Sequence, residues 1–351
     1  MAVSQLSLLL FHSLLAIATI TSAVAAATPY LSPTTLFPNY QKMLTTFKIY
    51  TYTPPSQFTS TVTTQPESLF TTSLLASPFV TQDPEEAHLF FLPFHPDLPT
   101  RSLARQVREL RQKLPYWNRT LGADHVFLSL SGIDYSSDRN SLELKKNSVQ
   151  ISRFPTTSGH FIPHKDITLP PLNPSPLAVP HAPPANKTAT YLGYMRADGL
   201  PEESSIVNEL INDPDFVIGS QPSDGLGEMG NSKFCLFVYG GEVTWIGEAM
   251  AAGCVPAVVA DRPIQDLPLM DVLRWTEIAV FVGTRGGARG LKEVLRGVGE
   301  ERYERMKGLG AEASRHLAWN AAPQPHDAFH MVMYQLWLRR HTIRYTRREW
   351  V

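Results

Sequence analysis

Paired glycines and two carboxylates stand close together in the second half of the chain. Gly240 and Gly241 follow an apolar run typical of a buried strand, and Glu242 and Glu248 come soon after them. Backbone N–H groups at such a turn, and at the start of the helix behind it, can bind a diphosphate. A carboxylate on that helix can accept hydrogen bonds from ribose hydroxyls. The pattern indicates a nucleotide-sugar site, and the alternative is a tight turn followed by a surface helix.

Two basic residues extend this candidate site. Arg196 follows the pair Leu192–Gly193, and Lys233 stands at the start of the apolar run that leads to the glycines. Positive side chains near a diphosphate would stabilise the charge that a departing nucleotide gains in the transition state. Solvated surface charge is the alternative for both residues.

Two other clusters have the outline of metal sites. His326 and His330 are four residues apart with Asp327 between them, which is similar to the H-E-x-x-H pattern of metallohydrolases. The prolines before His326 place it at the beginning of a helix, where Asp327 suits the first turn, so we expect no metal there. Asp213 and Asp215 form a D-x-D pair, but the proline between them favours a turn.

The chain has only two cysteines, which excludes a disulfide-rich scaffold and a four-cysteine zinc site. Cys235 and Cys254 end or begin neighbouring expected strands. They could form a disulfide in an oxidising compartment or remain two reduced thiols in the core. Asn118 and Asn186 each begin an N-x-Thr sequon for N-glycosylation, which slightly favours a luminal placement.

Charge and composition exclude several classes of protein. The 351 residues carry 31 Lys+Arg and 32 Asp+Glu, a formal net charge of −1, so the basic surface of a nucleic-acid-binding protein is not expected. A charged fraction of 18% beside 43% hydrophobic residues indicates a globular chain rather than a disordered one. No P-loop of the G-x-x-x-x-G-K-[ST] kind occurs in the sequence.

The first 27 residues contain a long uncharged segment. No Asp, Glu, Lys or Arg lies between Leu6 and Ala27, and the first basic side chain is Lys42. The segment is long enough to span a bilayer, while Ala23–Ala25 has the A-x-A shape of a signal-peptidase site. A cleaved signal peptide and a retained signal-anchor both stay open, with a buried soluble helix as a third alternative. Either targeting segment would send the rest of the chain into the secretory lumen.

Apolar runs and helical patterns alternate along the chain in two series. In the first series we predict strands at 47–52, 88–94 and 125–130, and helices at 67–75 and 102–114. The stretch 155–184 holds nine prolines and is predicted to be an extended connector. In the second series we predict strands at 189–194, 216–218, 234–238, 255–260 and 278–282, and helices at 204–211, 244–252, 290–297, 301–319 and 327–340. Such alternation predicts an α/β chain with two Rossmann-like domains and a cleft between them.

Several segments together resemble the plant exostosin-like glycosyltransferases, glycosyltransferase family 47, in the order in which that family carries them. They are Asp83–Phe94, Leu114–Arg119, Asp124–Phe127, Lys165–Ile167, Ser232–Leu236, Glu248–Pro256, Asp271–Trp275 and Asp327–Met331. The resemblance implies a GT-B architecture and an inverting transfer from a sugar nucleotide without an obligatory metal. It also implies a type II membrane protein of the Golgi that builds cell-wall polysaccharide.

The resemblance assigns roles to individual residues. Glu248 matches the donor-contacting acid that precedes a turn like Gly253-Cys254-Val255-Pro256, and Arg196 matches a basic residue that faces the diphosphate. The chain departs from the family between Glu242 and Glu248, where about two residues and an arginine are missing. An inverting transfer needs a general base near the acceptor hydroxyl. Asp134 is the candidate, and a turn-capping aspartate is the alternative.

We therefore expect an enzyme, an inverting glycosyltransferase that uses a UDP-linked sugar and a cell-wall or other glycan acceptor in the Golgi lumen. It would be a single-pass type II membrane protein, or a soluble luminal one if the signal is cleaved, with no metal cofactor and no nucleic-acid partner. The alternatives are a weak or inactive glycan-binding pseudoenzyme and a metallohydrolase using His326 and His330. We expect a targeting segment at 1–27 and an acceptor-side domain with the connector at 28–185. A nucleotide-sugar-binding domain follows at 186–325, and a last helix at 326–351 packs back toward the first domain.

Overall fold

The computed structural model of the protein describes residues 28–52, 65–95, 98–130, 132–156, 159–172, 189–197, 205–219 and 225–346. The expected targeting segment, residues 1–27, and the sequon at Asn186 lie outside these residues. Within the described ranges, no helix combines the length and the apolar character needed to cross a membrane.

The N-terminal domain is built on a six-stranded sheet with the order β2-β1-β3-β4-β5-β6, and all of its pairings are parallel. The central strands β3 and β4 are buried at every position, as expected for strands covered by helices on both faces. The strands are β1 (Ile49–Thr51), β2 (Val80–Thr81), β3 (Leu89–Leu92), β4 (His125–Leu128), β5 (Val149–Arg153) and β6 (Ile167–Leu169).

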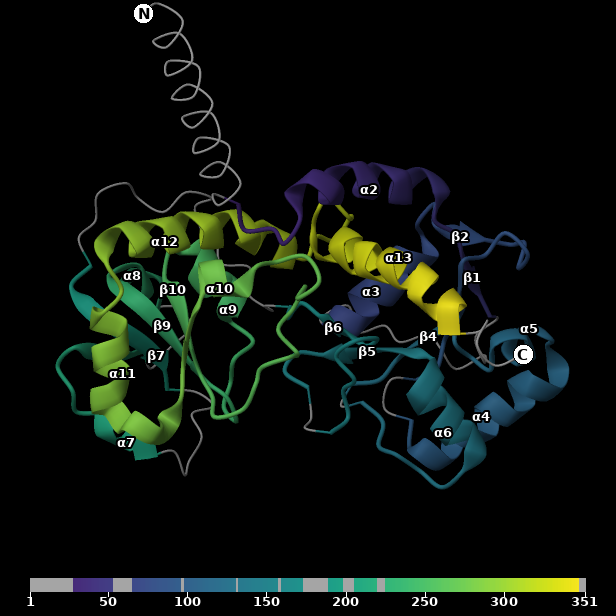
Figure 1. The fold of residues 1–351 in the computed structure, drawn as a ribbon, viewed down its shortest axis with the longest axis horizontal. Coiled ribbons are helices and arrows are strands. Elements are labelled where there is room, and N and C mark those ends of the chain that lie inside the picture. The colour runs from purple at the N-terminus through teal and green to yellow at the C-terminus, as the bar shows by residue number, and fades with distance from the viewer. Residues whose placement is uncertain are drawn as a thin grey trace, which may run out of the picture.

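Two layers of helices cover this sheet (Figure 1). On one face, α4 (Thr100–Lys113), α5 (Tyr116–Thr120) and α6 (Arg139–Asn147) pack on the even-numbered side chains of β3, such as Phe90. On the other face, α2 (Pro33–Thr46), α3 (Pro66–Leu75) and α13 (Ala328–Thr346) pack on the odd-numbered ones, such as Phe91. The alternation follows from the two-residue period of a strand.

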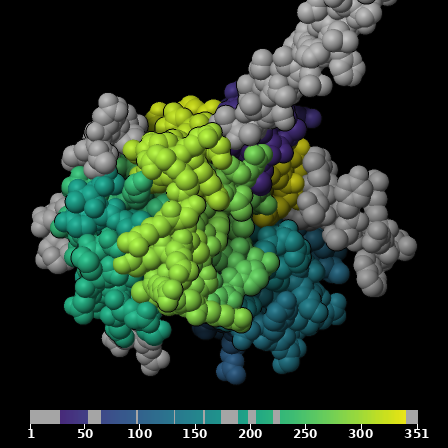
Figure 2. Space-filling model, turned by 60° about the vertical axis from the view of Figure 1, so that its left-hand side comes forward, coloured from purple at the N-terminus to yellow at the C-terminus, as the bar shows by residue number. Residues whose placement is uncertain are grey.

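The C-terminal domain has a five-stranded parallel sheet with the order β11-β10-β9-β7-β8. Its strands are β7 (Tyr191–Arg196), β8 (Phe216–Gly219), β9 (Ser232–Val238), β10 (Val255–Val259) and β11 (Val280–Val282). Its α-helices are α7 (Ser205–Leu210), α8 (Gly225–Gly230), α9 (Ile246–Ala251), α10 (Trp275–Ile278), α11 (Gly287–Arg296) and α12 (Glu300–Ser314). The 3-10 turns η1 (Thr284–Gly286) and η2 (Arg315–Leu317) adjoin α11 and α12, which cover the outside of this domain in Figure 2.

Two parallel α/β sheets, each with helices on both faces, give the two-domain GT-B architecture that the sequence predicted. Most of the expected strands and helices occur, with ends that differ by a few residues. The prediction of an extended connector at 155–184 is wrong at residues 167–169, which form a strand of the sheet, and residues 173–184 lie outside the described residues. There β6 pairs with β5 at the sheet edge, because Pro163 and Pro170 flank the strand and leave its ladder intact.

One hydrophobic core joins the two domains. It contains Phe91 of the N-terminal sheet, Met250 on α9, Leu273 before α10 and Phe329 on α13. The chain start takes part as well, since Tyr30 forms an antiparallel bridge with Leu273. The last helix, α13, lies against β6 and α2 of the N-terminal domain. Segments from both ends of the chain therefore tie the domains together.

Candidate active site

The carboxyl ends of the C-terminal strands lie along one edge of the sheet. The register pairs Arg196, the last residue of β7, with Gly219 of β8, and it pairs Val259 of β10 with Val238 and Val282. Ligands of open parallel α/β sheets bind outside this edge. The loops that follow β7, β9 and β10 are therefore the part of the domain where a nucleotide would bind.

This edge meets the carboxyl edge of the N-terminal sheet. The ring of Tyr239, directly after β9, lies 6.5 Å from the ring of Phe154, directly after β5. Asp266 is 2% exposed and accepts hydrogen bonds from the backbone N–H of Thr156 at 3.0 Å and from its hydroxyl at 2.8 Å. The Tyr239 hydroxyl donates to the same carboxylate at 3.3 Å. Asp266 thus joins the ends of β5 and β9 across the domain boundary.

Tyr239 keeps its proton in this setting. Burial, and after it the nearby carboxylate of Asp266, raise the pKa of Tyr239 well above its usual range. The guanidinium of Arg262 lies 5.3 Å from the centre of the same ring. The sequence pattern did not single out Tyr239 or Asp266, although Tyr239 directly precedes the glycine pair.

The turn after β9 depends on Gly240. Its φ of +102° lies in a region that residues with a side chain rarely adopt, and no atom lies within 4 Å of where a Cβ would be. Gly241 returns to pair with Tyr239 in a one-residue parallel bridge. The backbone here is strained for any other residue while the space above it is open, which suits the close approach of a ligand.

Glu242 fixes the path from this turn into α9. Its carboxylate accepts from the backbone N–H of Thr244 at 2.7 Å and from the Thr244 hydroxyl, while its carbonyl accepts from the indole of Trp245 at 3.2 Å. Glu242 is exposed and lies at the expected edge. Its observed contacts hold the short loop, and Glu248 follows in the first turn of α9, partly buried.

The side chain of Arg196 lies over the ring of Trp245. Its guanidinium lies 5.8 Å from the ring of Trp245, a distance at which a cation and an aromatic face attract each other. The Trp245 ring packs against the rings of Phe237 and Tyr194, with 4.1 Å and 5.8 Å between ring centroids. These contacts restrict the position of the indole. The structure therefore places Arg196, the glycine turn and the start of α9 at the same edge of the sheet, and their binding of a diphosphate stays a prediction.

Lys233 does not lie with them, and its placement in the donor site is corrected. It is the second residue of β9, at the amino end of the sheet, while Gly240 follows the carboxyl end. Seven residues of extended chain separate the two by about 20 Å. Its ammonium instead bonds Glu300 at 2.7 Å and lies 4.9 Å from the ring of Tyr303.

Gly253 also lies away from the site. It follows α9, which runs antiparallel to the strands and returns the chain to the amino edge. With a φ of +79°, Gly253 ends the helix, and its N–H donates to the carbonyl of Met250 at 3.1 Å. Its role is to stop α9, so the expectation that it contacts the donor is wrong.

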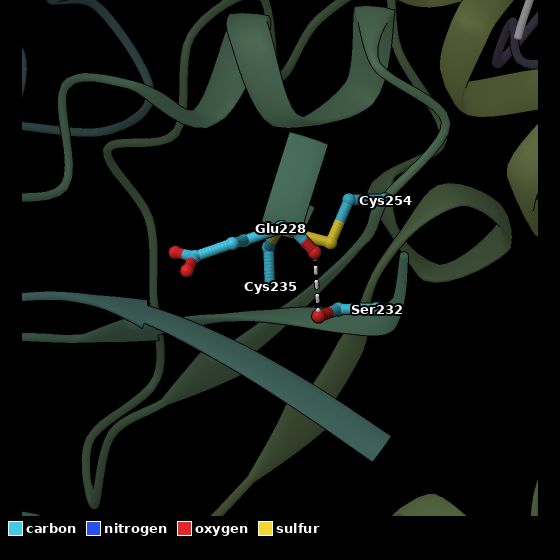
Figure 3. Close-up of a disulfide and its surroundings, with 4 residues drawn as sticks. All are labelled: Glu228, Ser232, Cys235 and Cys254. Carbon is cyan, nitrogen blue, oxygen red and sulfur yellow. Dashed lines mark hydrogen bonds between the residues drawn. A yellow bond between two sulfur atoms is a disulfide. The ribbon is translucent and has the colours of Figure 1, made fainter. Parts of the chain in front are cut away.

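The two cysteines are joined in a disulfide between β9 and the start of β10. Cys235 and Cys254 are both buried, with 5.7 Å between their Cα atoms. Figure 3 shows the bond near Ser232, whose hydroxyl donates to the carbonyl of Glu228 at 2.9 Å. The disulfide therefore joins β9 and β10 near their amino ends, while their carboxyl ends lie at the candidate site.

Asp134 lies on an exposed loop beyond the carboxyl end of β4. One of its carboxylate oxygens accepts from the backbone N–H of Tyr135 at 2.7 Å, a contact typical of a turn-forming aspartate. Its role as general base stays a prediction. Asn118 is exposed in the middle of α5, and its amide nitrogen donates to the carbonyl of Arg111 at 3.3 Å, so its glycosylation stays a prediction.

A partly buried ion pair at the same edge was missed from the sequence. Glu67, at the start of α3, is 4% exposed and faces Arg153 at the end of β5. The guanidinium binds both carboxylate oxygens, at 2.8 and 3.1 Å, and also the amide oxygen of Gln65 at 3.0 Å. Because 86 residues separate the partners, no local pattern could have found them.

The two suspected metal clusters have other partners. The ring of His326 stacks on Tyr40 with 4.0 Å between centroids, and His330 Nδ1 lies 3.2 Å from Asp327. Asp213 and Asp215 both bind Lys292, and this lysine lowers the pKa of Asp213. In the part of the chain that the structure describes, no three His, Cys, Asp or Glu side chains are grouped to hold a metal ion.

Comparison with known families identifies the chain. The model of the exostosin GT47 domain matches residues 43–298, which include both sheets and the site at their carboxyl edges. The chain belongs to the exostosin GT47 family. It is therefore a glycosyltransferase by family, and its Arg196, glycine turn and Glu248 form the candidate GT47 donor site.

The relatives are plant proteins. A probable glycosyltransferase of Arabidopsis thaliana is 29% identical, with 90% of this chain and 72% of the relative aligned. A probable beta-1,4-xylosyltransferase of the same plant is 28% identical, with 74% of this chain and 72% of the relative aligned. A probable glucuronosyltransferase of Oryza sativa subsp. japonica is 26% identical, with 82% of this chain and 79% of the relative aligned. Two further Arabidopsis relatives are longer, and the alignments span 60% and 55% of them.

Proposed function

We propose that this GT47 protein transfers a sugar from a UDP-linked donor to a glycan acceptor with inversion of configuration. The observation that carries the proposal is the convergence of Arg196, the Gly240 turn and the start of α9 at the carboxyl edge of the C-terminal sheet. A diphosphate at this edge would meet backbone N–H groups and a guanidinium, and ribose hydroxyls would meet Glu248.

The chemistry assigned to these groups is electrostatic. As the bond between the sugar and the diphosphate breaks, negative charge develops on the phosphate oxygens, and Arg196 stabilises it in a partly buried setting. The Trp245 ring beneath the guanidinium fixes its position in advance. In this proposal Arg196 stabilises the leaving group, and a carboxylate of the N-terminal domain, Asp134, takes the proton of the acceptor hydroxyl.

The acceptor and the compartment are proposals of the same kind. Relatives named as xylosyl- and glucuronosyltransferases of plants support a cell-wall polysaccharide acceptor. The uncharged segment at residues 6–27 and the sequon at Asn118 support the Golgi lumen, with a signal-anchor or a cleaved signal. The Cys235–Cys254 disulfide suits that oxidising compartment.

A second candidate function is a glycan-binding pseudoenzyme. One observation favours it: the carboxylate of Glu242 is engaged by Thr244, and the short loop to Glu248 contains no arginine. A donor would then rely on Arg196 for the positive charge that this loop does not supply.

Calorimetric titration of the full chain with UDP, followed by a transfer assay with a panel of UDP-sugars and xylo-oligosaccharide acceptors, separates the two functions. We expect saturable 1:1 binding of UDP and release of UDP during transfer. Binding of oligosaccharide without binding of UDP would support the pseudoenzyme. Absence of UDP binding at millimolar concentration would rule out the transferase.

A further inference from the structure

A cavity of about 360 Å³ opens in the N-terminal domain between α4 and the strands β1 and β3. Its volume lies at the lower end of the range of small-molecule sites, about 300 to 1,000 Å³. The lining combines aromatic rings, one amide and a charged rim, contributed by Tyr50, Tyr52, Phe94, Gln106, Glu109 and Lys113.

The aromatic side of the cavity is rigid. Tyr50 and Tyr52 project from the same face of β1 and its continuation, with ring centroids 5.6 Å apart and planes at 90°. The Tyr52 hydroxyl is 2.8 Å from Nε2 of His125, and the two rings stack at 5.7 Å. Tyr50 also packs on Tyr116 at 6.1 Å. Such fixed aromatic faces suit the C–H face of a sugar ring, which needs an apolar partner of defined shape.

One side chain of the lining, Gln106, carries a polar atom without a partner among the described residues. The amide oxygen Oε1 of Gln106 on α4 is buried and accepts no hydrogen bond from any described residue. Buried acceptors without a donor are rare in native structures. Gln106 as a whole is partly exposed and lines the cavity, so a rotation about its terminal side-chain bond would let a hydroxyl of a ligand reach this oxygen.

The rim indicates a neutral ligand. Glu109 and Lys113 lie one turn apart on α4 with 3.9 Å between carboxylate and ammonium, and their side chains are 55% and 74% exposed. The opposite charges compensate each other and leave hydrogen-bonding groups of both kinds at the opening. Apolar faces, an amide side chain in the lining and a mixed rim together match a neutral polyhydroxyl ring better than a phosphate or an aliphatic chain.

The cavity is separate from the donor site. At the carboxyl edge of the N-terminal sheet, the ends of β5 and β6 contact the C-terminal domain, where Thr156 and Thr168 bond Asp266 and Leu267. In the sheet order, β1 and β3 lie two to four strands away from these, which is about 10 to 20 Å. Both the cavity and the junction lie toward the carboxyl edge of the same sheet, as Tyr52 follows β1 and Phe94 follows β3.

We propose that this cavity binds a neutral sugar residue of the acceptor glycan, several residues away from the one that receives the new sugar. The assignment as an acceptor subsite rests on the proposed transferase function. The binding of a neutral oligosaccharide by the cavity does not depend on that function. A long acceptor would run along the carboxyl edge of the sheet from the domain junction to α4, so affinity should rise with acceptor length.

Titration of the full chain with xylohexaose and cellohexaose, with and without saturating UDP, tests the proposal. Gln106→Leu removes the amide and keeps the size, and Gln112→Leu makes the same change at an exposed position of α4 outside the cavity. We expect the wild type to bind at least one hexasaccharide and Gln106→Leu to weaken it by about tenfold, the equivalent of one hydrogen bond. Gln112→Leu should bind as the wild type does.

UDP affinity separates the two proposals. It should be equal in all three proteins, because the cavity lies away from the donor edge. In transfer assays, Gln106→Leu should raise KM for xylohexaose and leave KM for xylobiose unchanged. Equal hexasaccharide binding by the wild type and Gln106→Leu, or no binding of either hexasaccharide to the wild type, would overturn the cavity assignment. A wild type that fails to bind UDP would overturn the transferase function alone, since the comparison without UDP still decides the cavity.

Discussion

At the scale of the residue, the two candidate donor cations differ in where the fold places them. Arg196 is the last residue of β7, at the carboxyl edge, and Lys233 is the second residue of β9, at the amino edge. Arg196→Ala should weaken UDP binding roughly 10- to 100-fold, the effect of losing a charge-assisted contact. Lys233→Ala removes the same charge but loses contacts to Glu300 and Tyr303 at the other edge of the sheet, so UDP affinity should not change. Calorimetry on both variants checks this, and equal losses would show that bulk charge, not the site, attracts UDP.

Gly240 allows a second test at single-residue scale. Alanine fits the space at Gly240 but not its φ of +102°, so Gly240→Ala should lower the free energy of unfolding by about 1 to 3 kcal/mol and weaken UDP binding. Gly308 lies inside α12 with open space around it, so Gly308→Ala should raise stability by roughly 0.5 to 1 kcal/mol. Urea unfolding of both variants measures whether the free energy of unfolding falls in Gly240→Ala and rises in Gly308→Ala. A neutral Gly240→Ala would contradict the strained turn.

At the scale of the element, the disulfide joins β9 to the start of β10 over 19 residues of sequence. A cross-link that closes a loop of this length stabilises a fold by about 3 kcal/mol, mainly by restricting the unfolded chain. The double variant Cys235→Ala/Cys254→Ala should lose about that much in denaturant unfolding, and the reduced wild type should lose a similar amount. If the oxidised wild type and the double variant unfold at the same denaturant concentration, the bond does not contribute.

The contact between η2 and the start of the chain should respond to pH. His316 lies 2.8 Å from the Tyr30 hydroxyl and bonds the carbonyl of His326, and burial lowers the pKa of both histidines below about 6.5, the usual value. The unfolded chain therefore binds more protons as pH falls from 6.5, so stability is complete above that pH and is lost as pH falls through the folded-state values. Urea midpoints should drop between pH 6.5 and 5.5. His316→Asn should flatten this slope, and His164→Asn, at an exposed histidine, should not.

The sequence predicted where the strands and helices lie along the chain, but not how their ends are arranged in space. Local patterns predicted the strands, the turn at Gly240 and the helix with Glu248, because period, glycine and apolar runs are local signals. They did not predict at which end of the sheet a residue would lie, which is why Lys233 and Gly253 were misplaced. The partners of Asp266 and Arg153 come from segments far apart in the chain, so they required the fold itself.

At the scale of the whole molecule, the sequence suggested two domains of similar size, whereas the structure shows one core that both share. Tyr30 from the chain start and Phe329 from α13 belong to that core together with residues of both sheets. Each domain also has a smaller core of its own, with Leu92 in the N-terminal one and Leu291 in the C-terminal one. The proposed donor edge and acceptor edge meet at Asp266, and the shared core fixes the position of one relative to the other.

The shared core predicts that the two domains unfold together. Calorimetry should show a single transition whose calorimetric and van't Hoff enthalpies agree. Leu92→Ala and Leu291→Ala each leave a cavity in the core of one domain and should cost about 2 to 5 kcal/mol. With coupled domains, either variant lowers the melting temperature of the whole protein and leaves one transition. With independent domains, each variant would split the curve and shift only its own part, because the other domain would keep its stability. That result would mean that Asp266 and α13 hold the two edges together only after each domain has folded.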